Sequence, residues 1–167
     1  IERAPAGYPH LLIGLSQLRH GEAGEGQYTA GGAVRAEARV VRTGAEATTL
    51  AVELRIRPGW HVNAERPLQD YLVPTSVRLA DGDRGWRIER TVYPAPRTVR
   101  LGFQPESLAL YEGAVRIDAR LQRTNGQGGT RPWLPVEVRQ QACSDQVCLA
   151  PETLTLNVPV DSSAFGE

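Results

Sequence analysis

The chain has 167 residues and carries 19 basic and 19 acidic side chains, so its formal net charge is zero. A chain of this length corresponds to a single domain and can bury an adequate core without a stabilising disulfide. The charge balance argues against a strong electrostatic attraction to nucleic acid or anionic lipid, and we predict no nucleic-acid partner.

No stretch reaches the roughly 18 apolar residues that a membrane-spanning helix needs. The longest apolar run near the start, Leu11-Leu12-Ile13, is too short for the core of a signal peptide. The chain begins at Ile1 without an initiator methionine, which is compatible with removal of a signal sequence or with a longer parent protein. We therefore expect a soluble segment.

Residues 1–31 are rich in Gly, Ala, Pro and Glu and show no sustained hydrophobic period. We expect an irregular N-terminal lead-in here. The pattern changes at Gly32, where apolar and charged residues begin to alternate, and this alternation predicts a domain over residues 32–160. Residues 161–167 are then a C-terminal tail.

Strands with one buried face are predicted at 32–40 and 50–56, the second ending at Pro58-Gly59. Further strands are predicted at 60–63, 75–79, 86–93, 114–121, 136–142 and 153–160. Their spacing predicts that the inward-facing side chains include Val34, Leu50, Val52, Leu54, Ile56, Val115, Ile117 and Leu121.

Eight or so short strands with no helical period predict an all-β fold, and we favour an immunoglobulin-like antiparallel β-sandwich. The connection over residues 94–110 is long. Connections of that length are usually functional lids or disordered segments.

Cys143 and Cys148 are the only cysteines, and four residues separate them. A disulfide between them would close a loop of about six residues, which the chain-entropy estimate values at only about 2 kcal/mol. Local, accessible disulfides are typical of reducible pairs, so a redox couple is the favoured interpretation. A non-catalytic binding or assembly module with a structural disulfide is the principal alternative.

A metal site is a third interpretation, because two thiolates with a histidine can bind copper or zinc. His61 is the only histidine in a strongly patterned part of the chain. A copper-handling protein that uses Cys143, Cys148 and His61 therefore stays open. The redox interpretation needs no metal or other cofactor.

Five segments, in order, carry a family resemblance: Pro58-Gly59-Trp60-His61-Val62-Asn63, Tyr71-Leu72-Val73-Pro74-Thr75, Tyr93-Pro94-Ala95-Pro96, Tyr111-Glu112-Gly113, and Ala142 to Cys148 followed by Pro151-Glu152-Thr153. Together they resemble the N-terminal domain of DsbD-type thiol:disulfide interchange proteins, the membrane-anchored disulfide reductases of the bacterial envelope. The resemblance runs from about residue 32 to 160.

The resemblance implies an immunoglobulin-like protein-disulfide reductase module in the periplasm or another extracytoplasmic space, tethered to the inner membrane through a parent protein. Such a domain relays electrons through Cys143 and Cys148 from a thioredoxin-like donor to oxidised envelope proteins, a chemistry that also serves cytochrome c biogenesis. The implied partners are thioredoxin-like domain proteins and a membrane-embedded electron-transfer domain of the same parent.

This chain departs from well-known members of the family at two points. Its cysteine spacing is one residue shorter, and His61 and Asn63 stand where those members carry tyrosines. A cysteine on a strand depends on neighbouring charge and hydrogen bonds to tune its pKa, and His61 is the nearest candidate source. By analogy with the family, Cys148 is the sulfur that a partner attacks.

Three further residues are expected to support or shield the cysteines. Asp145 and Glu152 flank the pair, and a carboxylate close to a sulfur raises the thiol pKa. In the resembled family a loop covers the disulfide. By position that loop is here roughly 98–105, with Phe103 over the sulfurs.

Overall fold

The structure is a computed structural model that describes residues 26–42, 48–80, 85–100, 105–124 and 133–159. These residues form one short 3-10 helix, η1, at Ala30–Gly32, and twelve strands. The strands are β1 Gly26–Thr29, β2 Val34–Arg42, β3 Thr48–Ile56, β4 Trp60–Asn63, β5 Ser76–Leu79, β6 Trp86–Val92, β7 Arg97–Arg100, β8 Ser107–Tyr111, β9 Ala114–Arg123, β10 Trp133–Gln140, β11 Ala142–Ser144 and β12 Glu152–Pro159. Within the described ranges, no helix has the length and apolar character needed to cross a membrane.

Five strands form the larger sheet in the order β1-β2-β3-β9-β6, and every neighbouring pair is antiparallel. Alternation along β2, β3 and β9 sends one set of side chains to the interior. The predicted inward-facing set is confirmed, because each member is at most 6% exposed: Val34, Leu50, Val52, Leu54, Ile56, Val115, Ile117 and Leu121.

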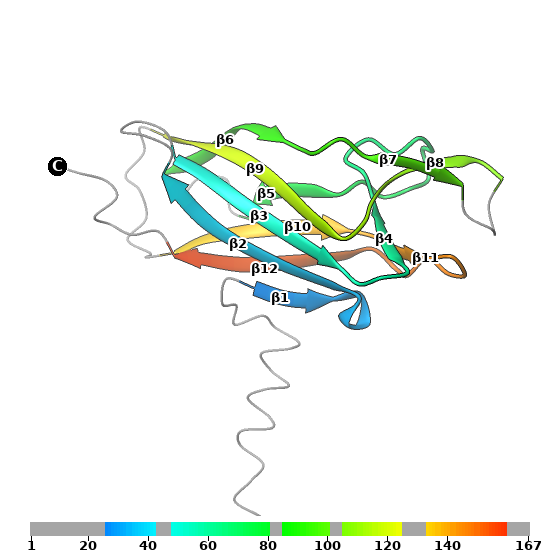
Figure 1. The fold of residues 1–167 in the computed structure, drawn as a ribbon. Coiled ribbons are helices and arrows are strands. Elements are labelled where there is room, and N and C mark those ends of the chain that lie inside the picture. The colour runs from blue at the N-terminus through cyan, green and yellow to red at the C-terminus, as the bar shows by residue number, and fades with distance from the viewer. Residues whose placement is uncertain (1–25, 43–47, 81–84, 101–104, 125–132, 160–167) are drawn as a thin grey trace, which may run out of the picture.

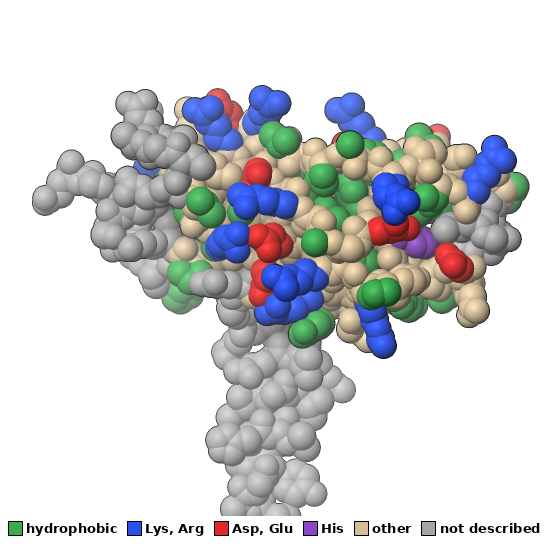
Figure 2. Space-filling view, viewed as in Figure 1, with side chains coloured by type: hydrophobic (Ala, Val, Ile, Leu, Met, Phe, Trp, Pro, Cys, Tyr) green, Lys and Arg blue, Asp and Glu red, His purple; other side chains and the backbone are tan. Residues whose placement is uncertain are grey.

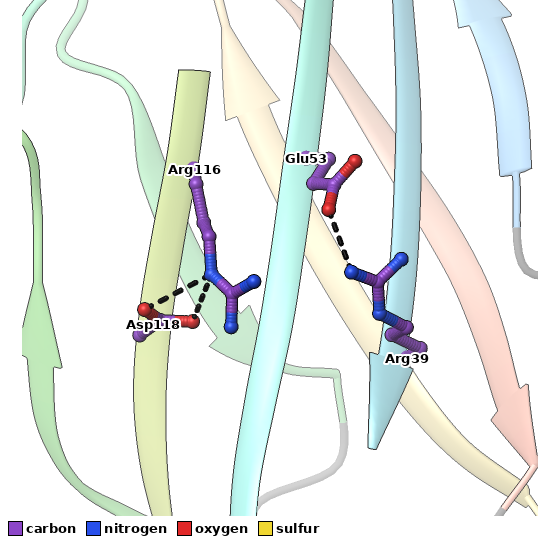
Figure 3. Close-up of polar contacts among 4 residues, drawn as sticks. All are labelled: Arg39, Glu53, Arg116 and Asp118. Carbon is purple, nitrogen blue, oxygen red and sulfur yellow. Dashed lines mark hydrogen bonds and ion pairs between the residues drawn. The ribbon is translucent and has the colours of Figure 1, made fainter. Parts of the chain in front are cut away.

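The opposite face of this sheet is polar. Arg39 Nη2 lies 2.8 Å from Glu53 Oε1, and Arg116 Nε lies 2.9 Å from Asp118 Oδ1 (Figure 3). Basic and acidic side chains are intermixed on the face shown in Figure 2. Exposed pairs of this kind contribute only about 0.2–1 kcal/mol each, so the stability of the sheet comes from its buried face.

A three-stranded sheet, β12-β10-β5, forms the second layer (Figure 1). Its buried side chains join the same core as those of the larger sheet: Val77, Leu134, Val136, Val138, Leu156 and Val158. Two antiparallel sheets packed on one core make an immunoglobulin-like β-sandwich, and the predicted fold class is confirmed.

A four-stranded sheet, β11-β4-β8-β7, lies at one end of the sandwich, on the right in Figure 1. Tyr111, Val62 and Ala142 are paired across β8, β4 and β11, and all three belong to the main core. Their strand neighbours must point to the other face, because successive side chains in a strand alternate. That other face carries the cysteines.

The predicted strand 136–142 is wrong as a single element, because the chain changes sheets within it. β10 pairs with β12 and β5, whereas β11 pairs with β4. Gln141 lies between the two strands, and its side chain makes hydrogen bonds to neighbouring segments that a regular ladder residue would not need.

Two expectations about irregular segments are also wrong in part. β1 lies within the segment 1–31 that was expected to be irregular, and it pairs with β2. β7 and all but the last residue of β8 lie within the expected connection 94–110, and the two strands pair with each other. The predicted shielding loop 98–105 therefore begins in β7.

Candidate functional site

Cys143 and Cys148 form a disulfide across a tight hairpin turn, with their Cα atoms 4.0 Å apart. The Ser144 N–H donates to the Val147 carbonyl at 2.8 Å, and the Leu149 N–H donates to the Ala142 carbonyl at 2.9 Å. These bonds hold the two cysteines side by side as an isolated bridge.

The two sulfur-bearing residues differ sharply in exposure. Cys143 is 1% exposed, whereas Cys148 is exposed to solvent. The turn between them is held by the Ser144 hydroxyl, which accepts hydrogen bonds from the N–H groups of Gln146 and Val147 at 3.2 and 3.3 Å. A serine hydroxyl that caps nearby backbone groups is a common way to fix a tight turn. Cys148 is therefore presented to solvent on an ordered hairpin.

His61 lies directly opposite Cys143 in the antiparallel pairing of β11 with β4. The turn Pro58-Gly59 starts β4, with Gly59 at φ 80° and the Trp60 N–H donating to the Arg57 carbonyl at 3.0 Å. Directly opposed residues of an antiparallel pair project from the same face. The imidazole of His61 and the sulfur of Cys143 therefore share the face turned away from the main core.

On the other side of His61, the pairing of β4 with β8 matches Val62 with Tyr111. Continued by one residue, this register sets Glu112 opposite His61. Glu112 is itself paired with Arg97, whose Nη1 lies 2.7 Å from Glu112 Oε2. A carboxylate just beyond the end of β8, an imidazole on β4 and a cysteine on β11 thus lie in one row.

His61 is 3% exposed, and its Nε2 has no hydrogen-bond partner. Burial lowers the pKa of His61 from its ordinary value of 6.5, because the charged form loses hydration. The carboxylates of Glu112 and Asp145 act in the opposite direction and raise it. Burial is the larger effect, so the imidazole is neutral at pH 7.

Asn63 and Gln141 anchor the cysteine hairpin to the loop after β4. Asn63 is fully buried, and its Nδ2 donates to the Val73 carbonyl at 3.0 Å and to Gln141 Oε1 at 3.2 Å. Gln141 Oε1 also accepts from the Val73 N–H at 3.3 Å, and Gln141 Nε2 donates to the Leu149 carbonyl at 3.1 Å. The residue after Cys148 is therefore tied to the rest of the end sheet.

Glu152, the first residue of β12, contacts the junction of β1 and η1. Its carboxylate accepts hydrogen bonds from the Thr29 hydroxyl and, at 3.1 Å, from the Ala30 N–H. Asp145, by contrast, lies within the cysteine turn and influences His61. Phe103 lies outside the described residues, so its shielding role stays a prediction.

Sequence reasoning did not select Gln141 or Glu112 as site residues. Two features of the sequence could have indicated them. Glu112 belongs to the Tyr111-Glu112-Gly113 segment, and Gln141 stands two positions before Cys143. Within the described part of the chain, no three His, Cys, Asp or Glu side chains are grouped so as to hold a metal ion. The described residues therefore contain no such group to support the copper-handling alternative.

The N-terminal family of thiol:disulfide interchange protein DsbD matches this sequence over residues 33–159. Among solved structures, the N-terminal periplasmic domain of ScsB from Proteus mirabilis gives a TM-score of 0.50 at 18% identity, covering 79% of this chain and 49% of that chain. This chain thus spans about half the length of the ScsB structure.

The N-terminal domain of DsbD from Neisseria meningitidis, in the reduced form, gives a TM-score of 0.50 at 10% identity, covering 75% of this chain and 86% of that chain. At such low identities these two likenesses show the fold alone. No curated protein sequence matches this one significantly. The family match, however, covers more than half of the residues. This chain therefore belongs to the family of DsbD N-terminal domains.

Proposed function

We propose that this domain exchanges its Cys143–Cys148 disulfide with thioredoxin-like proteins and relays reducing equivalents to oxidised proteins. Membership of the DsbD N-terminal family and the presence of the disulfide support thiol–disulfide exchange in general. The observation that carries the relay is the difference in exposure between the two sulfur-bearing residues. Cys148 is open to a partner, and Cys143 is buried behind it.

The exchange has two halves. A thiolate of the reducing partner attacks the Cys148 sulfur, the bond between Cys148 and Cys143 breaks, and Cys143 leaves as a thiolate. The partner's second thiol then attacks the mixed disulfide and releases the domain as a dithiol. Two electrons have passed to the domain, and the same steps in reverse reduce an oxidised protein.

The location and the larger assembly are proposed by analogy. The related ScsB domain is periplasmic. We propose a periplasmic or other extracytoplasmic location for this domain, with a tether to the inner membrane through a parent protein. A membrane-embedded electron-transfer domain of that parent would be a second partner beside the thioredoxin-like protein.

The order of attack can be tested with single-cysteine variants. The attacking cysteine of a thioredoxin-like domain that lacks its resolving cysteine is first activated as a nitrothiobenzoate disulfide. Reduced Cys143→Ser, which keeps the exposed Cys148, should displace the chromophore and form a covalent adduct on non-reducing gels. Cys148→Ser, the matched variant that keeps the buried Cys143, should react much more slowly. Equal rates for the two variants would contradict the proposed order.

A redox titration tests the relay against a structural disulfide. Structural disulfides have potentials below about −300 mV, whereas a relay has to be more oxidising than that. If neither single-cysteine variant forms an adduct and the wild-type disulfide also resists reduction by the partner's dithiol, the pair is structural and the proposed function is wrong.

A further inference from the structure

We propose that His61 takes the proton from the buried Cys143 thiol when Cys143 resolves a mixed disulfide held on Cys148. This inference rests on the proposed exchange function and assigns one step of it to a residue. It concerns the direction in which the reduced domain reduces an oxidised partner.

The geometry of the end sheet brings the two groups together. His61 and Cys143 are directly opposed in the pairing of β4 with β11, and Cβ atoms of such pairs lie about 4.5–5.5 Å apart. Both residues are at most 3% exposed. The Nε2 atom of His61 has no partner, although buried polar atoms are almost always hydrogen-bonded. A thiol that appears beside it on reduction of the disulfide would supply one.

The chemistry of the resolving step needs a base. Only a thiolate attacks a disulfide sulfur, and burial in apolar surroundings makes a thiol harder to ionise. Cys143 is therefore a poor nucleophile unless a neighbour accepts its proton. A neutral imidazole is the side chain suited to this task at neutral pH.

The charged groups around His61 favour the same role. Glu112, immediately after β8, and Asp145, in the cysteine turn, both raise the pKa of His61 and so stabilise the imidazolium that forms. Arg97 on β7 forms an ion pair with Glu112 and partly offsets the negative charge of that carboxylate. A carboxylate behind an imidazole serves to orient and stabilise it in other nucleophilic sites.

The Cys143 thiol gives its proton to His61, and the Cys143 thiolate attacks the Cys148 sulfur of the mixed disulfide. The bond between the two cysteines forms, the bond between Cys148 and the partner sulfur breaks, and the partner leaves as a thiolate. The domain is oxidised from dithiol to disulfide, the partner disulfide is reduced, and His61 returns its proton to solvent or to the leaving thiolate.

Ellman's reagent, an aromatic disulfide, separates resolution by Cys143 from the initial attack by Cys148. The reduced domain should release one chromophore when exposed Cys148 attacks the reagent, and a second when Cys143 resolves the resulting mixed disulfide. In His61→Gln the first phase should keep its wild-type rate at pH 7.5. The second phase should slow by about 100-fold, the lower end of what a positioned general base contributes.

The pH profile of the second phase provides a readout that a purely structural role would not move. In the wild type the rate should fall as the pH drops through the pKa of His61, because the imidazolium cannot accept a proton. Glu112→Gln keeps the imidazole but removes a carboxylate that raises its pKa, so the inflection should move to lower pH. In His61→Gln this inflection should be absent.

A wild-type second phase in His61→Gln, or an unshifted inflection in Glu112→Gln, would overturn the role of His61. Either result would leave the proposed function standing if the wild-type domain still exchanges with a thioredoxin-like partner. The Glu112→Gln variant retains His61 and therefore gives an answer even if His61→Gln fails to fold.

Discussion

The side-chain amide of Gln141 donates a hydrogen bond to the carbonyl of Leu149 at 3.1 Å and so closes the cysteine hairpin from outside its own ladder. Its oxygen accepts from the Asn63 side chain and from the Val73 N–H. One glutamine therefore connects the cysteine hairpin to Asn63 and Val73, which lie 78 and 68 residues earlier in the sequence. The hairpin that carries the disulfide depends on this side chain as well as on its own backbone bonds.

Replacing Gln141 by Met should lower the free energy of unfolding by about 1–3 kcal/mol, because the buried amide of Asn63 and the half-buried N–H of Val73 lose a partner. Denaturant unfolding of the oxidised protein measures this difference. The matched variant is Gln146→Met, in the exposed cysteine turn, which should change stability by less than about 0.5 kcal/mol. Equal stability of the two variants would show that the Gln141 network is not structural.

The acidic residues near the cysteines should differ in their effects on Cys148. Asp145 lies within the turn, and a nearby negative charge disfavours a thiolate. In the Cys143→Ser background, Asp145→Asn should therefore speed alkylation of Cys148 by iodoacetamide at pH 7 by about 1.5- to 5-fold, which corresponds to about 0.2–1 kcal/mol between exposed charges. Glu152→Gln is the control and should leave the rate unchanged, since its carboxylate binds Thr29 and Ala30. A faster rate in Glu152→Gln would restore the expected influence of that carboxylate on the sulfur.

The longest predicted strands are those with one apolar and one polar face. β2, β3 and β9 alternate over eight residues or more, so their periodicity is visible. The sequence did not predict β1, β7 or β8. The only buried residue of β1 is the polar Thr29, and β7 is mostly exposed. In β8 four consecutive residues are buried, because both faces are covered, and alternation is lost.

The site was predictable to the extent that its chemistry is local. Two cysteines with four residues between them, and a histidine in a patterned segment, can be recognised without a structure. Glu112 and Gln141 act through strand pairing and through hydrogen bonds between segments distant in sequence. Neither is defined until β4, β8 and β11 have been brought together, so the sequence pattern alone did not indicate them.

Phe103 is predicted to shield the disulfide from small thiols. If its ring covers the sulfurs, dithiothreitol should reduce the Cys143–Cys148 disulfide faster in Phe103→Ala than in the wild type. Tyr28→Ala provides the matched control, because Tyr28 is 63% exposed on β1 and a change there should not alter the rate. An unchanged rate in Phe103→Ala would mean that Phe103 does not cover the disulfide.

Burial of His61 should also make the stability of the oxidised domain depend on pH. The pKa of His61 is lower in the folded protein than the ordinary value of 6.5, so the unfolded chain binds the proton first as the pH falls. Binding of more protons by the unfolded state means that stability decreases with falling pH, beginning near pH 6.5 and levelling off below the folded-state pKa. The slope for one group cannot exceed about 1.4 kcal/mol per pH unit.

The difference in unfolding free energy between wild type and His61→Gln, measured from pH 8 down to pH 5, isolates this contribution because all other groups titrate in both proteins. The unfolding free energy of the wild type minus that of His61→Gln should decrease over that interval. A constant difference would show that His61 keeps its ordinary pKa on folding.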